Sequence, residues 1–238
     1  MSQTDLIDFI KTKKRAHLVG IGGVSMSTLA EMLINRQVPV TGSDSNLQSE
    51  AVISLCKKGV EILLGHMAGN IEKVLPDFLI RTAAVHDDDP EIARARELHI
   101  PVFERAEAYG ALMREYQNAV CFAGTHGKTT STSMFICIAM AAGIDPSVML
   151  GGTLPLIGGG CRVGKHDMFI LEACEYRNSF LSFAPSVAVI LDIDADHMDF
   201  FKDLDDISRS FRKFAELVPK ETGKVVANID DRNTVECL

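Results

Sequence analysis

A glycine-rich turn near the middle of the chain constrains the fold more than any other feature. An apolar run at residues 119–123 stops at residues 124–130, which read Gly-Thr-His-Gly-Lys-Thr-Thr, and a helical pattern begins there. Glycines let backbone N–H groups point at phosphate oxygens, the start of a helix attracts anions, a lysine reaches the outer phosphates, and a threonine hydroxyl can bind Mg²⁺. The stretch therefore predicts a triphosphate cradle between a strand and a helix. Phe122 stands where the usual P-loop pattern has a glycine. A plain strand-to-helix turn is the alternative, although such a turn needs no Lys128-Thr129 pair.

Composition limits the class of protein. With 238 residues, of which 47% are hydrophobic, the chain can bury enough core for two folded units. A formal net charge of −8 argues against a surface for nucleic acid or anionic membranes. The six cysteines show no CxxC spacing and follow no secretory signal, and no apolar run approaches the ~18 residues of a membrane span. We therefore expect a cytoplasmic protein with reduced cysteines and no membrane insertion.

Short apolar runs alternate with helical patterns along the chain, which predicts an α/β fold with parallel sheets. In the first part, strands are expected at 16–20, 38–41, 78–80 and 100–103, and helices at 25–35, 50–58 and 90–98. A second unit begins near Gln117, with further strands at 168–171, 187–191 and 224–227. We place the domains at 1–105 and 106–238. The second domain is expected to be cut before its sheet is complete, because only seven residues follow the predicted loop at 228–231.

A second phosphate-accepting geometry lies near the start of the chain, at residues 20–26 (Gly-Ile-Gly-Gly-Val-Ser-Met). The turn follows a predicted strand and opens a predicted helix, as in the dinucleotide fingerprint G-x-G-x-x-G, but Ser25 replaces the third glycine. Asp44 follows at about the spacing of an acidic ribose contact. An NAD site, a site for another nucleotide diphosphate and a merely tight turn all remain open on these residues.

Acidic residues follow two of the predicted strands in the second unit. Glu172 ends one strand, and residues 192–199 (Asp-Ile-Asp-Ala-Asp-His-Met-Asp) follow another. Carboxylates at the carboxyl edge of a parallel sheet point into the crevice where phosphates bind, and hard oxygen ligands with one imidazole suit Mg²⁺. Solvated edge carboxylates and a lone hydrogen-bonded loop histidine are the alternatives. Delivery of Thr129, Glu172 and His197 to one crevice favours a metal site.

Motifs along the whole chain carry a family resemblance. They are Gly20-Ile-Gly-Gly23 with Met26, Gly42-Ser-Asp44, Gly65-His66, Ile100-Pro101 with Arg105-Ala-Glu107, residues 124–130, Glu172-Ala173 with Ser179-Phe-Leu181, and Asp196-His-Met-Asp199. Together they resemble the Mur ligases, and within that family the members that join L-alanine to UDP-N-acetylmuramate. The resemblance implies a Rossmann-like N-terminal domain for the UDP-sugar and a P-loop-type central ATPase domain with a mainly parallel sheet. The family's C-terminal domain, which helps to bind ATP and contacts the amino acid, is not in this sequence.

The resemblance also implies a reaction and its residues. ATP phosphorylates the muramoyl carboxylate, the amine of L-alanine attacks the acyl phosphate, and an amide of peptidoglycan synthesis results. By position, Lys128 would hold the β- and γ-phosphates, Thr129 one Mg²⁺, and Glu172 with His197 a second, so Lys128, Glu172 and His197 are the expected catalytic residues. The expected ATP-binding residues are Gly124, Thr125, His126, Gly127, Lys128, Thr129, Thr130 and Asn228. Those expected to face the UDP-sugar are Gly22, Gly23, Ser43, Asp44 and His66.

Two departures from the family pattern stand out. Many relatives read Glu-Ala-Asp-Glu-Ser-Asp where residues 172–177 read Glu-Ala-Cys-Glu-Tyr-Arg, and several use a carbamylated lysine, a role that we do not assign to Lys213. One alternative is a recycling ligase that adds a tripeptide to the same UDP-sugar. Others are a nucleotide-binding fragment without turnover and an NAD-dependent oxidoreductase, and the second phosphate loop argues against the last. The sequence leaves the oligomeric state open.

Overall fold

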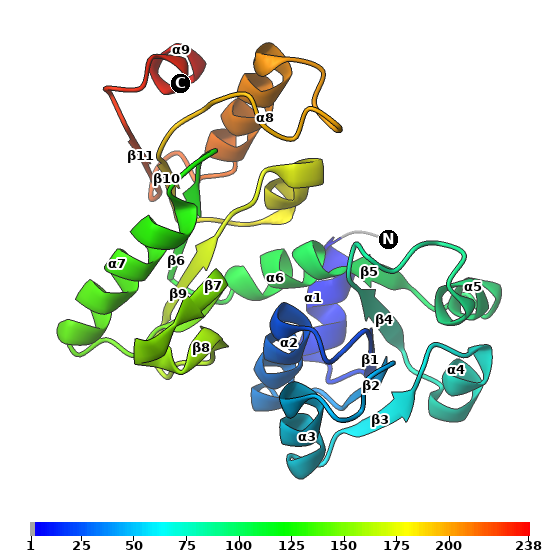
Figure 1. Ribbon diagram of the computed structural model, residues 1–238. Coiled ribbons are helices and arrows are strands. Elements are labelled where there is room, and N and C mark those ends of the chain that lie inside the picture. Colours follow the sequence, from blue (N-terminus) through cyan, green and yellow to red (C-terminus); the bar gives the residue numbers. More distant parts are fainter. Residues whose placement is uncertain (1–2) are drawn as a thin grey trace. The chain divides into compact units, whose positions relative to one another are not determined.

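Two sheets organise the residues that the computed structural model describes, 3–238 (Figure 1). Contacts divide the chain into two units, Met1–Ala111 and Leu112–Leu238. The division lies near the end of helix α6 (Arg105–Met113), whereas the sequence analysis placed it between residues 105 and 106. The hydroxyl of Tyr109 in α6 donates a hydrogen bond to the carbonyl of Ser25 (2.6 Å), so most of α6 packs with the first unit.

The sheet of the first unit has the strand order β3-β2-β1-β4-β5, and all of its pairs are parallel. Its strands are β1 (Ala16–Val19), β2 (Val40–Asp44), β3 (Glu61–Leu64), β4 (Phe78–Arg81) and β5 (Val102–Glu104). The central strands β1 and β4 are short apolar runs buried on both faces, as a covered parallel sheet requires. The strand order reverses between β1 and β4, and sheets of this kind bind ligands beyond the carboxyl ends of their strands at such a point.

Helices cover both faces of this first sheet. They are α1 (Gln3–Lys11), α2 (Val24–Asn35), α3 (Glu50–Lys57), α4 (Ala68–Val74) and α5 (Pro90–Glu97), followed by α6. Helix α2 contacts α3, and α4 contacts α5. From β1 the chain adds β2 and β3 on one side of the sheet and then β4 and β5 on the other. Because each crossover is right-handed, these two helix pairs lie on opposite faces of the sheet, as Figure 1 shows. Asp89 caps α5 by accepting a hydrogen bond from the backbone N–H of Glu91, and Pro90 opens the helix.

The sheet of the second unit has the order β11-β10-β6-β9-β7-β8. Its strands are β6 (Asn118–Ala123), β7 (Ser147–Leu154), β8 (Gly159–Arg162), β9 (Met168–Glu172), β10 (Val187–Ile190) and β11 (Lys224–Ala227). Every pair is parallel except β7 with β8, which are joined through a short 3₁₀ helix, η1 (Pro155–Ile157). Strand β11 lies at one edge, and Val225 and Val226 on it are 43% and 52% exposed.

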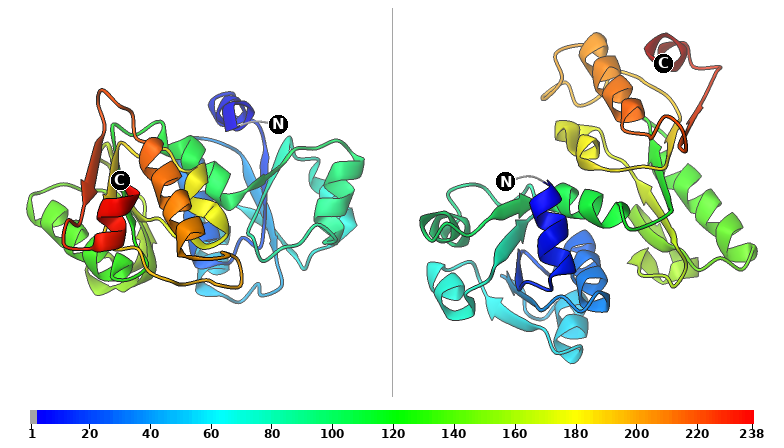
Figure 2. Two further views of the ribbon diagram at one scale, coloured as in Figure 1. Left: turned by 90° about the horizontal axis from the view of Figure 1, so that it is seen from above. Right: turned by 180° about the vertical axis from the view of Figure 1, so that it is seen from behind.

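The helices of the second unit are α7 (Lys128–Ala141), η2 (Tyr176–Ser182), α8 (Leu204–Glu216) and α9 (Arg232–Cys237). Helix α7 packs along the sheet and contacts β6, β9 and β7, as both Figure 1 and the right-hand view of Figure 2 show. Its Ile136 and Ala139 meet Val148 and Ile170 in an apolar core. Helix α8 contacts η2 and α9, and Phe214 stacks on Phe180 with ring centroids 4.7 Å apart.

The expected α/β architecture with mainly parallel sheets is confirmed. The structure adds elements that the sequence analysis did not name: α1, β3 and α4 in the first unit, and β7, β8 and α9 in the second. Residues 228–231 form the expected loop after β11, and α9 then follows with Asp231 as its N-cap. No helix among residues 3–238 is long and apolar enough to cross a membrane.

Candidate functional site

The loop between β6 and α7 has a backbone shape that its glycines permit. Gly124 has a φ of +152° and Gly127 a φ of +74°, values that residues with side chains rarely adopt. A Cβ atom on Gly124 would lie 2.8 Å from Oδ1 of Asp192, so a larger residue would displace the loop. Gly127 is the N-cap of α7, and no side chain caps this helix. The first turn of α7 therefore keeps its backbone N–H groups for an anion.

The segment after β10 fixes this loop. The carboxylate of Asp192 accepts a hydrogen bond from the backbone N–H of His126 (2.9 Å), while the hydroxyl of Thr125 accepts one from the N–H of Asp194 (2.8 Å). Strands β6 and β10 are parallel neighbours, with Ala123 opposite Ile190, so both strand ends reach the same edge of the sheet. The imidazole of His126 itself is exposed.

Lys128 folds back over the loop that precedes it. Its ammonium donates hydrogen bonds to the carbonyls of Gly124 (2.6 Å) and Thr125 (3.2 Å). The same ammonium lies 3.1 Å and 3.3 Å from the two carboxylate oxygens of Glu175. The side chain of Glu175 is 2% exposed, so this ion pair is largely shielded from water. Lys128 therefore lies at the phosphate loop, as predicted, with a carboxylate partner that was not predicted.

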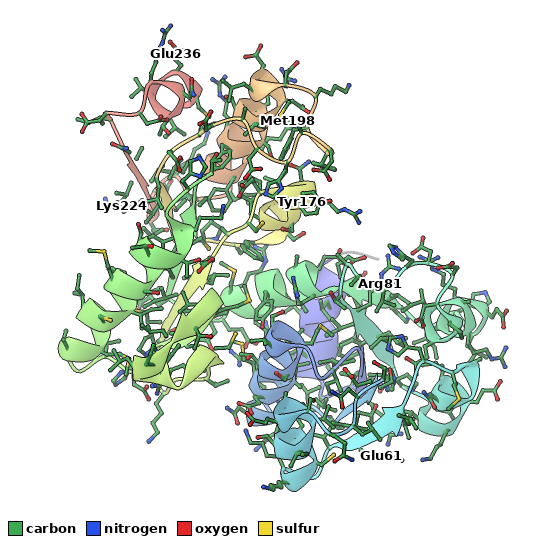
Figure 3. All side chains as sticks on the ribbon, viewed as in Figure 1. Glu61, Arg81, Tyr176, Met198, Lys224 and Glu236 are labelled. Carbon is green, nitrogen blue, oxygen red and sulfur yellow. The ribbon has the colours of Figure 1, made fainter. Side chains whose placement is uncertain are left out.

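Glu175 also lies beside His197. Nε2 of His197 is 3.6 Å from Oε1 of Glu175 and 3.8 Å from Oδ2 of Asp196. One ligand atom from each of Glu175, Asp196 and His197 falls within 4.8 Å of the others. His197 has a φ of +51°, and its ring lies 4.8 Å from the ring of Tyr176. The hydroxyl of Tyr176 donates to Asp199 (2.9 Å). Figure 3 shows Tyr176 on η2 and, near it, Met198 on the loop before α8.

Glu172 ends β9 on the other side of β6, since Phe122 pairs with Glu172 in register. Its Oε1 atom is buried and has no hydrogen-bond partner in the described part of the chain. A Cβ atom on Gly151 of β7 would come within 2.9 Å of Glu172 Oε2, so this glycine leaves room for the carboxylate. A Cβ on Gly152 would lie 3.0 Å from Cγ2 of Thr129, which places Thr129 beside the same strand.

Two further residues predicted to bind ATP lie outside this cluster of contacts. Thr130 lines a shallow cavity along α7 together with Thr129, Met134 and Ile138. Asn228 is exposed after β11, where its backbone N–H donates to the carbonyl of Ile190 (3.1 Å) and its side-chain oxygen accepts from the N–H of Asp230 (3.1 Å). A contact of Asn228 with adenine stays a prediction.

In the first unit, the turn after β1 is tied to the end of β2. The backbone N–H of Gly22 donates to Oδ2 of Asp44 (2.8 Å), and the N–H of Asn46 donates to Oδ1 (2.9 Å). A Cβ on Gly22 would lie 2.8 Å from that same Asp44 oxygen, so the close approach requires glycine. Gly23 is the N-cap of α2 and, like Gly127, it offers no side chain that could cap the helix. The structure thus gives Asp44 the role of shaping the turn, and its contact with a ligand stays a prediction.

The other two residues predicted for the UDP-sugar, Ser43 and His66, make polar contacts inside the unit, and of the two only Ser43 is buried. Ser43 is 0% exposed, and its hydroxyl donates to Oε2 of Glu91 (2.5 Å). The amide of Asn70 donates to Oε1 of Glu91 (2.6 Å), and Nε2 of His17 lies 3.7 Å from that atom. These donors hold the pKa of Glu91 below its usual value even though its burial opposes the shift. Nδ1 of His66 lies 2.6 Å from the carboxylate of Asp89, the cap of α5.

Sequence reasoning assigned no role to Glu175 or Glu91, and it placed Asp192 in the acidic segment 192–199 without foreseeing its hydrogen bond to the loop. Each follows or opens an element next to a predicted motif, and Glu175 stands three residues after Glu172. The available signal for Glu175 was the family pattern Glu-Ala-Asp-Glu-Ser-Asp, whose second glutamate this chain keeps at position 175. Glu172 and His197 were expected to share a cation. Among the described residues, His197 has its close carboxylate partners in Glu175 and Asp196 instead, and the shared site stays a prediction.

Comparison with protein families assigns both units. Residues 15–117 match the Mur ligase family, catalytic domain, and residues 122–237 match the Mur ligase middle domain. The UDP-N-acetylmuramate–L-alanine ligase of Clostridium botulinum (strain Hall) is 48% identical over 227 residues, which cover 95% of this chain and 49% of the relative. The protein of the same name from Caldanaerobacter subterraneus subsp. tengcongensis is 48% identical over 225 residues, 94% of this chain and 48% of the relative. The chain spans about half the length of the curated relatives it matches.

Solved structures agree with this assignment. The UDP-N-acetylmuramate-alanine ligase of Thermotoga maritima superposes with a TM-score of 0.79 at 30% identity, covering 94% of this chain and 51% of that one. The UDP-N-acetylmuramate:L-alanyl-gamma-D-glutamyl-meso-diaminopimelate ligase of Neisseria meningitides gives a TM-score of 0.83 at 24% identity, covering 94% and 74%, a likeness of fold. Because its two units match two domains of one family in chain order, over residues 15–117 and 122–237, the chain belongs to the Mur ligase family.

Proposed function

We propose that this chain forms the UDP-sugar-binding and ATP-binding parts of an ATP-dependent ligase that joins L-alanine to UDP-N-acetylmuramate in peptidoglycan synthesis. The observation that carries the proposal is the loop at residues 124–130, whose glycine backbone, uncapped helix start and Lys128 ammonium meet acidic strand ends at one sheet edge. Identity of 48% to proteins named UDP-N-acetylmuramate–L-alanine ligase supports the choice of substrates. A cytoplasmic location remains our expectation.

The donor set suits a divalent cation that accompanies the nucleotide. Glu172 has a buried oxygen that finds no partner among residues 3–238, and Thr129 lies beside the same strand β7. Glu175, Asp196 and His197 present oxygen and imidazole ligands within 4.8 Å of one another. Carboxylate and hydroxyl oxygens are the ligands that Mg²⁺ prefers. A bound Mg²⁺ would neutralise charge on the phosphoryl group that is transferred.

The chain's own residues would act by binding and positioning. The first turn of α7 offers backbone N–H groups to the phosphates, and Lys128 supplies a positive charge at the outer ones. Asp192 and Thr125 hold the loop in shape before ATP arrives, so that little reorganisation is needed on binding. In the first unit, the turn at Gly22 and the uncapped start of α2 at Gly23 would receive the diphosphate of the UDP-sugar.

The runner-up is the recycling ligase that adds a tripeptide to the same UDP-sugar. Solved ligases of that kind resemble this chain in fold at 24% and 23% identity, so they support no choice of substrate. The relatives at 48% identity favour L-alanine. A nucleotide-binding fragment without turnover is the second alternative, because the chain spans only half of those relatives.

Calorimetric titration of MgATP tests the proposed nucleotide site. Lys128→Ala removes a charge-assisted contact, and we expect it to weaken binding by about 1.5–3 kcal/mol, or roughly 10- to 150-fold. Lys165→Ala, which removes an exposed lysine of the same unit, serves as the matched control and should bind as the wild type does. Equal affinities of the wild type and Lys128→Ala would rule out this site.

Thermal shift tests the proposed UDP-sugar site. UDP-N-acetylmuramate should raise the melting temperature of the first unit in proportion to its occupancy, whereas NAD should not. Mass spectrometry of a reaction with ATP, UDP-N-acetylmuramate and either L-alanine or the tripeptide then separates the ligase alternatives. A shift with NAD alone would reverse the assignment of the first unit, and amide formed only with the tripeptide would favour the recycling ligase.

A further inference from the structure

Glu175 contacts both Lys128 and His197. In the proposed reaction these two residues bind different ligands: Lys128 binds phosphate, and His197 binds a divalent cation. Its carboxylate contacts the ammonium of Lys128 through both oxygens, at 3.1 Å and 3.3 Å. One of the same oxygens lies 3.6 Å from Nε2 of His197. The side chain of Glu175 is 2% exposed, and that of Lys128 is 17% exposed. A single buried carboxylate therefore neutralises the lysine of the phosphate loop and faces His197 in the loop between β10 and α8.

This arrangement cannot persist unchanged once a nucleotide binds. Lys128 has to direct its ammonium toward phosphate oxygens, and each contact with phosphate weakens its contact with Glu175. A buried carboxylate that loses its cation is strongly destabilised, because neither water nor another charge compensates it. Another positive charge must then take the place of Lys128 beside Glu175. Among the described residues, the side chains of His197 and Asp196 lie next to Glu175 and could bind a cation together with it.

We propose that Glu175 is a positioning residue that exchanges partners: it holds Lys128 before nucleotide binds, and it turns to the divalent cation beside His197 when phosphate takes Lys128. The inference rests on the proposed function, since it assumes that phosphates reach Lys128. The exchange couples two binding events. A cation on Glu175 releases Lys128 for the nucleotide, and a nucleotide on Lys128 frees Glu175 for the cation, so each ligand strengthens the other by the same factor.

The proposal gives opposite expectations for the two partners of the ion pair. Lys128→Met keeps an apolar stem but removes the charge that occupies Glu175, so Mn²⁺ alone should bind about 5- to 150-fold more tightly than to the wild type, the usual range of such coupling. Glu175→Gln keeps the shape of the side chain and removes the charge that holds Lys128, whose hydrogen bonds to the carbonyls of Gly124 and Thr125 remain. ADP in the presence of a chelator should then bind more tightly than to the wild type, whereas Mn²⁺ should bind more weakly.

A double-mutant cycle separates partner exchange from simple repulsion between Glu175 and phosphate. If Glu175 only repelled the nucleotide, Glu175→Gln would improve metal-free ADP binding equally in the wild-type and Lys128→Met backgrounds. If Glu175 instead exchanges partners, Glu175→Gln should improve the affinity for metal-free ADP in the wild-type background and leave it unchanged in the Lys128→Met background. Lys220→Met and Glu221→Gln alter two exposed charges of the same unit and serve as matched controls that should leave both affinities unchanged.

Calorimetry of Mn²⁺ and of metal-free ADP on the full chain, with circular dichroism to check folding, provides the readouts. The exchange is supported if Lys128→Met binds Mn²⁺ more tightly than the wild type and if Glu175→Gln raises the affinity for ADP only when Lys128 is present. Unchanged Mn²⁺ affinity in Lys128→Met, or an ADP gain independent of Lys128, overturns it. If no form of the chain binds nucleotide, the proposed ATP site fails, while the Mn²⁺ comparison between wild type and Lys128→Met still decides whether Lys128 and a cation compete for Glu175. That comparison also stands if Glu175→Gln fails to fold.

Discussion

Glu91 offers the sharpest test of how the first unit is held together. Its side chain is fully buried and accepts hydrogen bonds from Ser43 (2.5 Å) and Asn70 (2.6 Å). The substitution Glu91→Gln keeps the size and shape of the side chain, removes its charge and turns one acceptor oxygen into an NH2 donor, whose hydrogen bond the hydroxyl of Ser43 can accept by rotating while the remaining oxygen still accepts from Asn70. We expect this change to destabilise the unit that contains β1 to β5, and to leave the second unit as it is.

The magnitude follows from the two hydrogen bonds. A hydrogen bond to a charged group contributes about 1.5–3 kcal/mol and a neutral one about 0.5–1.5 kcal/mol, so each bond loses on the order of 1–1.5 kcal/mol when the carboxylate becomes an amide. The amide is less costly to bury than an ionised carboxylate, which offsets part of the loss. We therefore expect a net decrease of about 2 kcal/mol in the free energy of unfolding at pH 7, close to a 30-fold change in the opening equilibrium.

The pH dependence has a definite sign. Burial favours the neutral form of Glu91, but the hydrogen bonds from Ser43 and Asn70 and the nearby imidazole of His17 outweigh it and lower the pKa of Glu91 below its usual 4.5. The folded state thus prefers the ionised form, and its stabilisation is complete above that usual value. It is lost as the pH falls through the lowered pKa. The difference in stability between wild type and Glu91→Gln should accordingly shrink at acid pH.

Hydrogen exchange followed by mass spectrometry measures this difference in the first unit alone. The chain contains no tryptophan, so intrinsic fluorescence would report poorly on either unit. Wild type and variant are compared at equal pH, from 7 down to about 3.5, so that intrinsic exchange rates cancel. Glu97→Gln alters an exposed acid of the same helix, α5, and should change stability by less than about 0.5 kcal/mol. A difference for Glu91→Gln that is absent at pH 7, or that stays constant into acid, would refute the reasoning.

Three further substitutions probe the second unit. Gly124→Ala should destabilise the loop by about 1–3 kcal/mol and abolish ATP binding, because Gly124 has a positive φ and an added Cβ would lie 2.8 Å from a neighbouring carboxylate oxygen. Calorimetry compares this variant with Gly159→Ala, where the added Cβ meets no described atom within 4 Å. Glu172→Gln should weaken Mn²⁺ binding without lowering the melting temperature, since the buried oxygen has no partner to lose; a clear loss of stability would show that Glu172 is structural. Tyr176→Phe should leave Mn²⁺ affinity almost unchanged, while Tyr176→Ala should reduce it, because the ring and not the hydroxyl packs on His197; equal effects in a Mn²⁺ titration would contradict that division.

The sequence predicts the fold well where apolar runs are continuous. Strands β1, β4, β6 and β9 are largely buried on both faces, and β10 is buried on one face and half-buried on the other, so their runs of apolar residues mark them without help from tertiary contacts. Strand β3 (Glu61–Leu64) escaped notice because it lies at a sheet edge and is half exposed, and β7 contains the glycine pair Gly151-Gly152. Those glycines have a reason that only the structure reveals: they leave room for Glu172 and Thr129.

The candidate site also has one part that the sequence predicts and another that depends on the order of the strands. The phosphate loop follows from local rules of glycine, lysine and helix start, so residues 124–130 could be located from the sequence. The partners of that loop depend on which strands lie next to one another. Asp192 and Glu175 approach the loop only because β10 and β9 flank β6 in the sheet, and no spacing along the chain encodes that order. The family resemblance predicted that Ser43 faces the UDP-sugar; the structure adds that its hydroxyl donates to Glu91, and its contact with a ligand stays a prediction.

The edge strand β11 has a consequence for handling the protein. Among the described residues β11 pairs only with β10, and Val225 and Val226 expose apolar surface on both of its faces. An open strand edge with valines on either side is a template on which a second molecule can add a strand, so solutions of this chain should grow turbid as concentration and temperature rise. Val226→Lys would place a charge on that edge and should keep the protein clear under the same conditions, as light scattering would record. The colloidal behaviour of the whole chain would then depend on four residues, Lys224–Ala227.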